Sequence, residues 1–290
     1  MNHEERGMHE FACTLIQTAG LKLKLARKQS VIKVREKTSQ MDLVTEQDVL
    51  IEKFLVEEIL EKYPGHHILA EESHGLECYT GVSHTEASQD KVNCDRDAYT
   101  WVIDPIDGTI NYYRFGKDYA ISLALYRYGS PVFGLVYDVA NNVIFNGRHC
   151  EGALMNGARL NILPVRQERL NKAVVSMSLR TMKEFAGLGM DVLGMLSKVQ
   201  AHRYIGCASL ELCKVANGDY DLFISSNVYE WDVAAARIFL EQRGGIFILG
   251  RKEKSSFPFG KLLVAAYRSP SIWEEAWDHL PQCVRDKFIQ

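Results

Sequence analysis

Paired cysteines, a strong charge of one sign and long apolar runs are all missing from this sequence. The seven cysteines are an odd number and form no CxxC pair, which argues against a disulfide framework and against a zinc knuckle. The net charge is −3, so the chain has no general attraction to nucleic acid or to an acidic membrane. The first 29 residues carry early acidic groups and no uninterrupted apolar core, which argues against a signal peptide and a membrane span there. We therefore expect a cytoplasmic protein with reduced thiols.

Sequence motifs for nucleotide binding and for acyl chemistry are missing as well. No GxxxxGK[ST] loop occurs, and "GLGMDVLG" at 187–194 lacks both a preceding strand and the third glycine of a dinucleotide fingerprint. No Ser or Cys lies in a nucleophile elbow, so covalent acyl chemistry has no support. Any catalytic function must therefore rest on other groups.

The hydrophobic pattern that is present predicts mixed α/β layering. A hydrophobic content of 47% and a charged content of 24% are typical of a globular protein, and 290 residues can bury a large core. We expect two interleaved subdomains, residues 1–160 and 161–290, and a long surface loop or flap over residues 73–99. Apolar spacing predicts helices over residues 1–28, 46–62, 181–199, 207–218 and 231–245. Strands are predicted at 66–73, 101–103, 220–226 and 261–267, with an antiparallel meander over 119–147 that turns near residues 141–142.

The stretch "TWVIDPIDGTINYY" at 100–113 places two carboxylates at the end of a predicted strand. Asp104 and Asp107 would lie at the rim of a sheet, where Pro105 restricts the backbone and Gly108 permits a tight turn, so both side chains can be aimed at one point. Two carboxylates this close repel each other unless a cation lies between them. A lone DxxDG is more often a capped turn, so the motif needs support from elsewhere in the chain.

Two further acidic residues, Glu71 and Asp232, also stand at ends of predicted elements. Asp232 alone would more often be a helix cap, since an aspartate at the start of a helix interacts well with the helix dipole. If all four carboxylates converge, their oxygen-only ligand set selects Mg²⁺ or Mn²⁺ rather than zinc. Two such cations about 4 Å apart would activate a water and stabilise a leaving oxygen, as in enzymes that act on phosphates.

Three segments, in this order, resemble the motifs of the inositol monophosphatase family, a Mg²⁺-dependent and lithium-sensitive phosphatase superfamily. They are "AEES" at 70–73, "WVIDPIDGTINY" at 101–112 and "EWDVAAA" at 230–236. "DLVTEQD" at 42–48 and "EKYPGHHILAEES" at 61–73 resemble the region upstream of the first motif. The resemblance covers roughly residues 10 to 270 and implies a layered αβαβα sugar-phosphatase fold with the active site between two subdomains.

The resemblance also implies a set of metal ligands. Glu71, Asp104 and the carbonyl of Ile106 would hold a first Mg²⁺, and Asp104, Asp107 and Asp232 would hold a second. A third, weaker Mg²⁺ would lie mainly on water and Glu71, and Mn²⁺ could replace Mg²⁺.

The nucleophile implied by the resemblance is a metal-activated water positioned by Glu71 and Thr109, with Asp48 hydrogen-bonded to Thr109 behind it. Backbone N–H groups around Gly108 and Thr109 would hold phosphate oxygens. Lys37 matches a lysine on a loop that closes over the metals, although a solvated surface lysine is an equally good interpretation.

Substrate contacts transfer less completely from the family to this chain. The residues that match positions near the substrate are Asp107, Gly108, Thr109, Gly206, Cys207, Ala208, Ser225 and Asp232. Ser225 stands where the animal enzymes place an inositol-binding glutamate, so the charge-assisted hydrogen bond is lost. The chain also has about a dozen more residues between Glu71 and Asp104 than the animal enzymes.

The expected reaction is hydrolysis of a small phosphate monoester, with myo-inositol monophosphate as the first choice of substrate. A 3′(2′),5′-bisphosphate nucleotidase and a fructose-1,6-bisphosphatase of the same superfamily are the alternatives within the enzymes. Outside them, an inactive metal-binding regulatory protein is disfavoured because Asp48, Thr109 and every matched metal ligand are present. The family resemblance also implies a homodimer.

Overall fold

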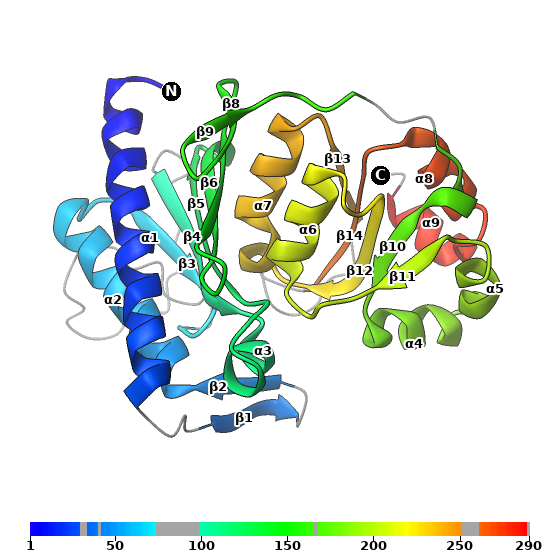
Figure 1. The fold of residues 1–290 in the computed structure, drawn as a ribbon, viewed down its shortest axis with the longest axis horizontal. Coiled ribbons are helices and arrows are strands. Elements are labelled where there is room, and N and C mark those ends of the chain that lie inside the picture. The colour runs from blue at the N-terminus through cyan, green and yellow to red at the C-terminus, as the bar shows by residue number, and fades with distance from the viewer. Residues whose placement is uncertain (30–33, 40–41, 74–98, 165–167, 251–260, 289–290) are drawn as a thin grey trace, which may run out of the picture.

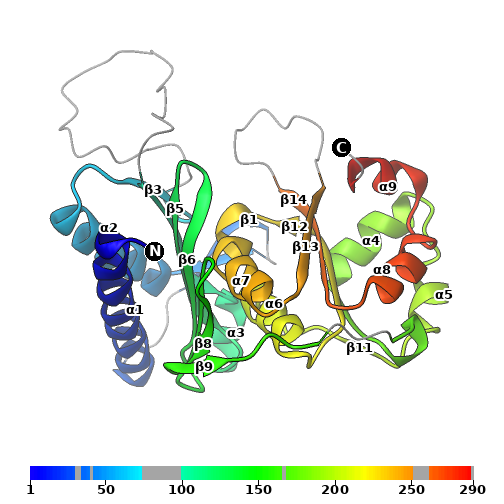
Figure 2. The same ribbon diagram turned by 90° about the horizontal axis from the view of Figure 1, so that it is seen from above.

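A computed structural model gives the structure of the chain and describes all residues except 30–33, 40–41, 74–98, 165–167, 251–260 and 289–290. Seen from above, the elements form five layers that alternate helices and sheets (Figure 2). The helices of the first layer are α1 (His3–Gln29) and α2 (Glu46–Lys62), and those of the middle layer are α6 (Ala208–Asn217) and α7 (Glu230–Gln242). The last layer holds α4 (Leu179–Gly187), α5 (Val192–Leu196), α8 (Pro270–Trp277) and α9 (Gln282–Phe288). This order confirms the αβαβα fold expected from the sequence.

The first sheet has seven strands and carries the DxxDG segment (Figure 1). Its strands follow one another in chain order: β3 (His67–Ala70), β4 (Tyr99–Asp107), β5 (Ala120–Arg127), β6 (Ser130–Asp138), β7 (Val143–Arg148), β8 (Gly152–Met155) and β9 (Ala158–Leu160). β3 and β4 are parallel, and the other neighbours are antiparallel. Trp101 and Ile103 face α1 and α2, whereas Val102 faces α6 and α7. Helices on both faces explain why β4, β5 and β6 contain long runs of consecutive buried residues.

The second sheet has five strands in the order β11-β10-β12-β14-β13. They are β10 (Val174–Met177), β11 (Ala201–Arg203), β12 (Leu222–Val228), β13 (Ile246–Gly250) and β14 (Leu262–Tyr267). β10 is parallel to β11 and to β12, so the carboxyl ends of these three strands lie at one edge, where ligands bind in open α/β sheets. The chain leaves that edge into α6 after β11 and into α7 after β12.

The middle helices join the two sheets into one packed unit. One buried cluster contains Val102 and Val136 of the first sheet together with Phe223 and Val264 of the second. Gly134 allows a close approach of α7, because a Cβ atom there would lie 2.4 Å from the carbonyl oxygen of Ala235. The start of α7 is therefore held against the strands that carry the acidic motif.

Smaller elements complete the fold and correct parts of the sequence-based prediction. The segment after α1 contains the antiparallel pair β1 (Val34–Ser39) and β2 (Asp42–Thr45). A short helix, α3 (Thr109–Arg114), follows β4, and the 3₁₀ turn η1 (Leu170–Lys172) precedes β10. Residues 74–98 of the expected 73–99 loop lie outside the described residues.

Two predictions about element ends were wrong. The single helix expected over 181–199 is divided into α4 and α5, because Gly189 between them has a φ of 91°, which ends a right-handed helix. The strand expected to end at Ile103 continues to Asp107, with a register shift between Asp104 and Asp107. The helices expected over 1–28 and 46–62 and the meander over 119–147 are confirmed. Within the described part of the chain, no helix combines the length and apolar composition needed to cross a bilayer.

His66 links fold stability to pH. The indole Nε1 of Trp101 donates to its Nδ1 at 2.9 Å, and its ring stacks on Tyr63 at 4.8 Å between centroids. Burial, with a smaller contribution from His67, lowers the pKa of His66 to about 4 from the usual 6.5. Below pH 6.5 the unfolded chain therefore binds a proton that the folded chain does not bind. This contribution to stability is complete above pH 6.5 and is lost as the pH falls toward 4.

We expect His66→Gln to weaken the pH dependence of unfolding, because glutamine can accept from Trp101 without titrating. Thermal unfolding of the wild type and of the variant would be compared at pH 7.5 and pH 5. Between pH 7.5 and pH 5 the Tm of the wild type should fall further than the Tm of the variant. The other titrating groups contribute equally in both proteins, so their effect drops out of this comparison. An equal loss in both proteins would show that His66 does not titrate as described.

Candidate active site

Asp104 is the buried centre of the acidic residues. It lies in β4 with a relative exposure of 1%, and its Oδ1 accepts a hydrogen bond from the backbone N–H of Ile106 at 3.0 Å. A register shift follows Asp104, around Pro105, and interrupts the regular alternation of side chains between the two faces of the strand. Asp107 can therefore also lie at this edge of the sheet. A proline is tolerated there because a bulge needs fewer ladder hydrogen bonds.

The electrostatics of Asp104 show that four carboxylates share this edge. Burial is the main reason why the pKa of Asp104 lies well above its usual range, and the nearby Glu71, Asp107 and Asp232 raise that pKa further. A hydrogen bond joins the side chains of Asp104 and Glu71. Like charges in a low-dielectric interior cannot all stay ionised unless a cation compensates them.

Asp107 joins the first sheet to the start of α6. Its Oδ1 accepts from the backbone N–H of Ala208 at 3.1 Å, and its Oδ2 accepts from that of Ser209 at 2.6 Å. Burial raises the pKa of Asp107, although the hydrogen bonds from 207–209 act in the opposite direction. The positive end of α6 thus faces the acidic edge.

Asp232 reaches the same edge from α7. Its Oδ2 accepts from the backbone N–H of Tyr229 at 2.8 Å, as a capping residue does. Ser122 helps to place Asp232 near Asp104. Ser122 lies opposite Asp104 in the pairing of β4 with β5, and its hydroxyl donates to the carbonyl of Trp231, the residue before Asp232, at 3.2 Å. Asp232 can therefore cap α7 and also belong to the group of carboxylates at this edge.

The buried Asp48 and the half-buried Thr109 form a hydrogen-bonded pair beside the carboxylates. Thr109 Oγ1 lies 3.0 Å from Asp48 Oδ1 and 3.1 Å from the carbonyl oxygen of Ile106, and its single proton can be donated to one of them at a time. The other oxygen of Asp48 accepts from the backbone N–H of Thr45 at 2.7 Å and from its hydroxyl at 2.5 Å. Burial is the largest cause that raises the pKa of Asp48 to about 6.

Glu52 is a residue that the sequence-based reasoning missed. It lies on α2, is 5% exposed, and accepts from the backbone N–H groups of Glu72 at 2.6 Å and Ser73 at 2.8 Å. These bonds hold the turn that directly follows Glu71. A glutamate on the apolar side of α2 was the only signal in the sequence, and its partner lies 20 residues away.

The donor atoms fit a hard divalent cation in their chemistry. They are carboxylate and carbonyl oxygens, and the negative charge of Asp104 is buried among three others. In the described part of the chain, however, no three His, Cys, Asp or Glu side chains already stand where they could hold a metal ion. Asp107 and Asp232 accept hydrogen bonds from backbone N–H groups, and each carboxylate has further lone pairs with which it could bind a cation.

The residues that we expected to contact the substrate differ from one another in burial and in hydrogen bonding. Gly206 adopts a φ of 80° and Cys207 is fully buried, so both place backbone rather than side chain at the edge. Ser225 is 4% exposed, and its Oγ accepts from the backbone N–H of Asn227 within β12. Lys37 lies in β1, and its side chain is outside the described residues.

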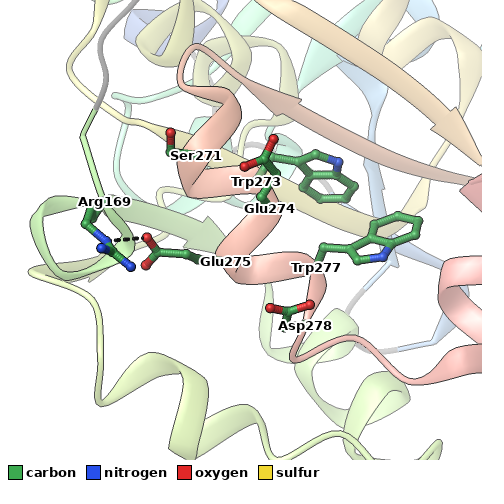
Figure 3. A pocket seen from close by; sticks show the side chains of 7 residues that line it. All are labelled: Arg169, Ser271, Trp273, Glu274, Glu275, Trp277 and Asp278. Carbon is green, nitrogen blue, oxygen red and sulfur yellow. Dashed lines mark hydrogen bonds and ion pairs between the residues drawn. The ribbon is translucent and has the colours of Figure 1, made fainter.

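A separate hollow of about 720 Å³ lies on the outer layer, at α8 (Figure 3). Glu275 there is paired with Arg169 at 2.7 Å, and the indoles of Trp273 and Trp277 pack into the core of the second sheet. None of the residues expected in the site lines this hollow.

Comparison with known proteins identifies the family of the chain. The chain matches the model of the inositol monophosphatase family over residues 4–282. Inositol-1-monophosphatase of Bacillus subtilis (strain 168) is 31% identical over 264 residues, which cover 91% of this chain and 92% of that protein.

Two solved structures are similar over nearly the whole chain. Inositol monophosphatase II from Staphylococcus aureus MSSA476 has a TM-score of 0.75 at 26% identity and covers 98% of this chain and 97% of its own. A structure described as 2′AMP-bound SaIMPase-II also has a TM-score of 0.75 at 26% identity, with 98% of both chains covered.

We expect Asp104→Asn to stabilise the metal-free protein and to abolish stabilisation by Mg²⁺. The asparagine keeps an acceptor for Ile106 and removes a buried charge, so the metal-free Tm should rise by roughly 2–4 °C, the shift that about 1 kcal/mol produces. Thermal unfolding with EDTA and with increasing Mg²⁺ measures both effects.

Asp221→Asn is the matched control, because Asp221 is also buried but accepts from Val174 at the opposite end of β12. That variant should keep the stabilisation by Mg²⁺. If Asp104→Asn kept it too, the cation would lie elsewhere.

Proposed function

The chain belongs to the inositol monophosphatase family, and from this premise we propose that it hydrolyses myo-inositol monophosphate to inositol and inorganic phosphate. As a member of the family it is a phosphatase that acts on small phosphate monoesters with a divalent metal cofactor. The observation that carries the proposal is the position of Asp104, a fully buried carboxylate surrounded by Glu71, Asp107 and Asp232.

We assign the metal ligands to the same edge. Glu71, Asp104 and the carbonyl of Ile106 would hold one Mg²⁺, and Asp104, Asp107 and Asp232 a second, with Glu71 serving a third, weaker ion. Mn²⁺ would substitute for Mg²⁺. Bound divalent cations would supply positive charge for the phosphate and activate a water for in-line attack on phosphorus.

The protein's own groups orient the attacking water. When the hydroxyl of Thr109 donates to Asp48, its lone pairs can accept a hydrogen bond from a water on the side of Glu71, and a proton taken from that water would be balanced by the Thr109 proton passing to Asp48. Asp48 is itself held in place by Thr45, so this acceptor is in position before substrate binds. Lys37, on β1, would add positive charge as the site closes.

Phosphate and leaving group would contact backbone around Gly108. Gly108 has a φ of 87°, which suits glycine and exposes neighbouring N–H groups of 108 and 109 to an anion. Gly206, Cys207 and Ala208 would face the hydroxyls of the leaving group, together with Asp107, Asp232 and Ser225.

A nucleotide is the second candidate substrate. Ser225 lacks the charge that an inositol-binding glutamate would supply, and a structural neighbour binds 2′AMP. A fructose bisphosphate would use the same carboxylates.

Three further expectations remain proposals: a homodimer, a cytoplasmic location, and a division into subdomains 1–160 and 161–290. The third is supported by the two sheets, which the chain builds one after the other.

Thr109→Ala should lower kcat by about a hundredfold or more, the range for a lost proton-transfer group. Thr109→Ser is the matched control, since it keeps the hydroxyl beside Asp48 and should retain most of the activity. Steady-state kinetics at saturating Mg²⁺ separate kcat from KM. A loss confined to KM would contradict the assigned role of Thr109.

Phosphate release tests the substrate. It would be measured with Mg²⁺ and with EDTA on inositol-1-phosphate, phosphoadenosine phosphate, 2′AMP and fructose-1,6-bisphosphate. We expect Mg²⁺-dependent release with the highest kcat/KM for inositol-1-phosphate. A higher kcat/KM for a nucleotide or for the sugar bisphosphate would replace the named substrate and leave the mechanism in place.

A further inference from the structure

Ile205 is held from both halves of the site at once. Its carbonyl oxygen accepts from the side-chain Nδ2 of Asn111 at 2.6 Å, and its backbone N–H donates to Oε1 of Glu211 at 2.6 Å. Asn111 belongs to α3, directly behind the DxxDG segment, and Glu211 belongs to α6. One residue of the connection between β11 and α6 therefore links the two elements.

Both side chains that hold Ile205 are buried, and their remaining hydrogen-bonding capacity is used nearby. Asn111 is 8% exposed and also donates to the carbonyl of Asp118 at 2.8 Å. Glu211 is fully buried, and its Oε2 accepts from the hydroxyl of Ser176 at 2.7 Å. Burial raises the pKa of Glu211, while hydrogen bonds from Ser176, Ile205 and Gly206 lower it. A buried carboxylate that depends on backbone donors fixes the path of that backbone.

The connection that these residues hold lies directly against the acidic segment. A Cβ atom at Gly108 would come within 3.2 Å of the Cβ of Cys207 and 3.3 Å of the carbonyl oxygen of Gly206. Directly after Cys207, the backbone N–H groups of Ala208 and Ser209 donate hydrogen bonds to the side chain of Asp107. A small displacement of this connection would move the start of α6 relative to Asp107.

We propose that Asn111 and Glu211 are positioning residues of the active site, which through Ile205 fix the amino end of α6 against Asp107 and Gly108. The role in turnover rests on the proposed function. Neither side chain needs to touch the substrate. Their effect is to keep the backbone donors of one half of the site at a constant place relative to the carboxylates of the other half.

Glu211→Met and Asn111→Ala test this role. Each should lower kcat roughly tenfold to a hundredfold at a temperature where the variant is folded, since displacements near 1 Å can cost that much. Because both act through Ile205, the double variant should be little worse than the poorer single variant. Glu211→Gln keeps an acceptor for the N–H of Ile205 and should restore most of the activity.

Ser176→Ala is the matched control. It removes the hydroxyl that donates to Glu211 and leaves both hydrogen bonds of Ile205, so it should lower the Tm while kcat stays within about twofold of the wild type. Amide hydrogen exchange followed by mass spectrometry gives a second readout. Exchange at residues 205–209 should accelerate in Glu211→Met and Asn111→Ala but not in Ser176→Ala.

Three results would overturn the proposal. They are an unchanged kcat in both folded single variants, a loss of kcat in Ser176→Ala as large as theirs, and losses that multiply in the double variant. If the wild type released no phosphate from any substrate, the proposed function would fail instead. The exchange at 205–209 would then still decide whether Asn111 and Glu211 hold the connection.

Discussion

The repulsion between the buried Asp104 and the carboxylates around it is the interaction on which the rest of the structure depends. A strand core with an exposure of 1% is a costly place for a negative charge, and three more acidic side chains raise the pKa of Asp104 further. Such an arrangement lowers the stability of the metal-free protein. The presence of these acidic side chains is explained if a divalent cation binds among them and offsets their repulsion. The carboxylates that destabilise the metal-free fold would then be the ligands of the site.

A few long-range contacts hold the two halves of the chain together around these carboxylates. Ser122 ties the start of α7 to the strand beside Asp104, and Asp107 accepts from the amino end of α6. Ile205 adds a third link, from α3 to α6. Because each link uses backbone groups, side chains elsewhere in the second half can vary without moving the carboxylate edge.

Local features of the sequence predicted the layered fold and directed attention to the acidic motifs. Helical spacing predicted α1 and α2, and the strand-end carboxylates pointed to a common edge. Contacts between distant residues could not be predicted in this way, and Glu52, Asn111 and Glu211 were missed because their partners are backbone groups 20, 94 and 6 residues away. The break at Gly189 was missed because apolar periodicity continues past a glycine whose positive φ only the folded chain reveals. The side chain of Lys37 and residues 74–98 lie outside the described residues.

The most direct test of the account is a crystal structure with Mn²⁺, with the ion located by its anomalous scattering. The account predicts anomalous peaks between Asp104 and its acidic neighbours Glu71, Asp107 and Asp232. Strong peaks only elsewhere, for example in the acidic hollow at α8, would contradict it.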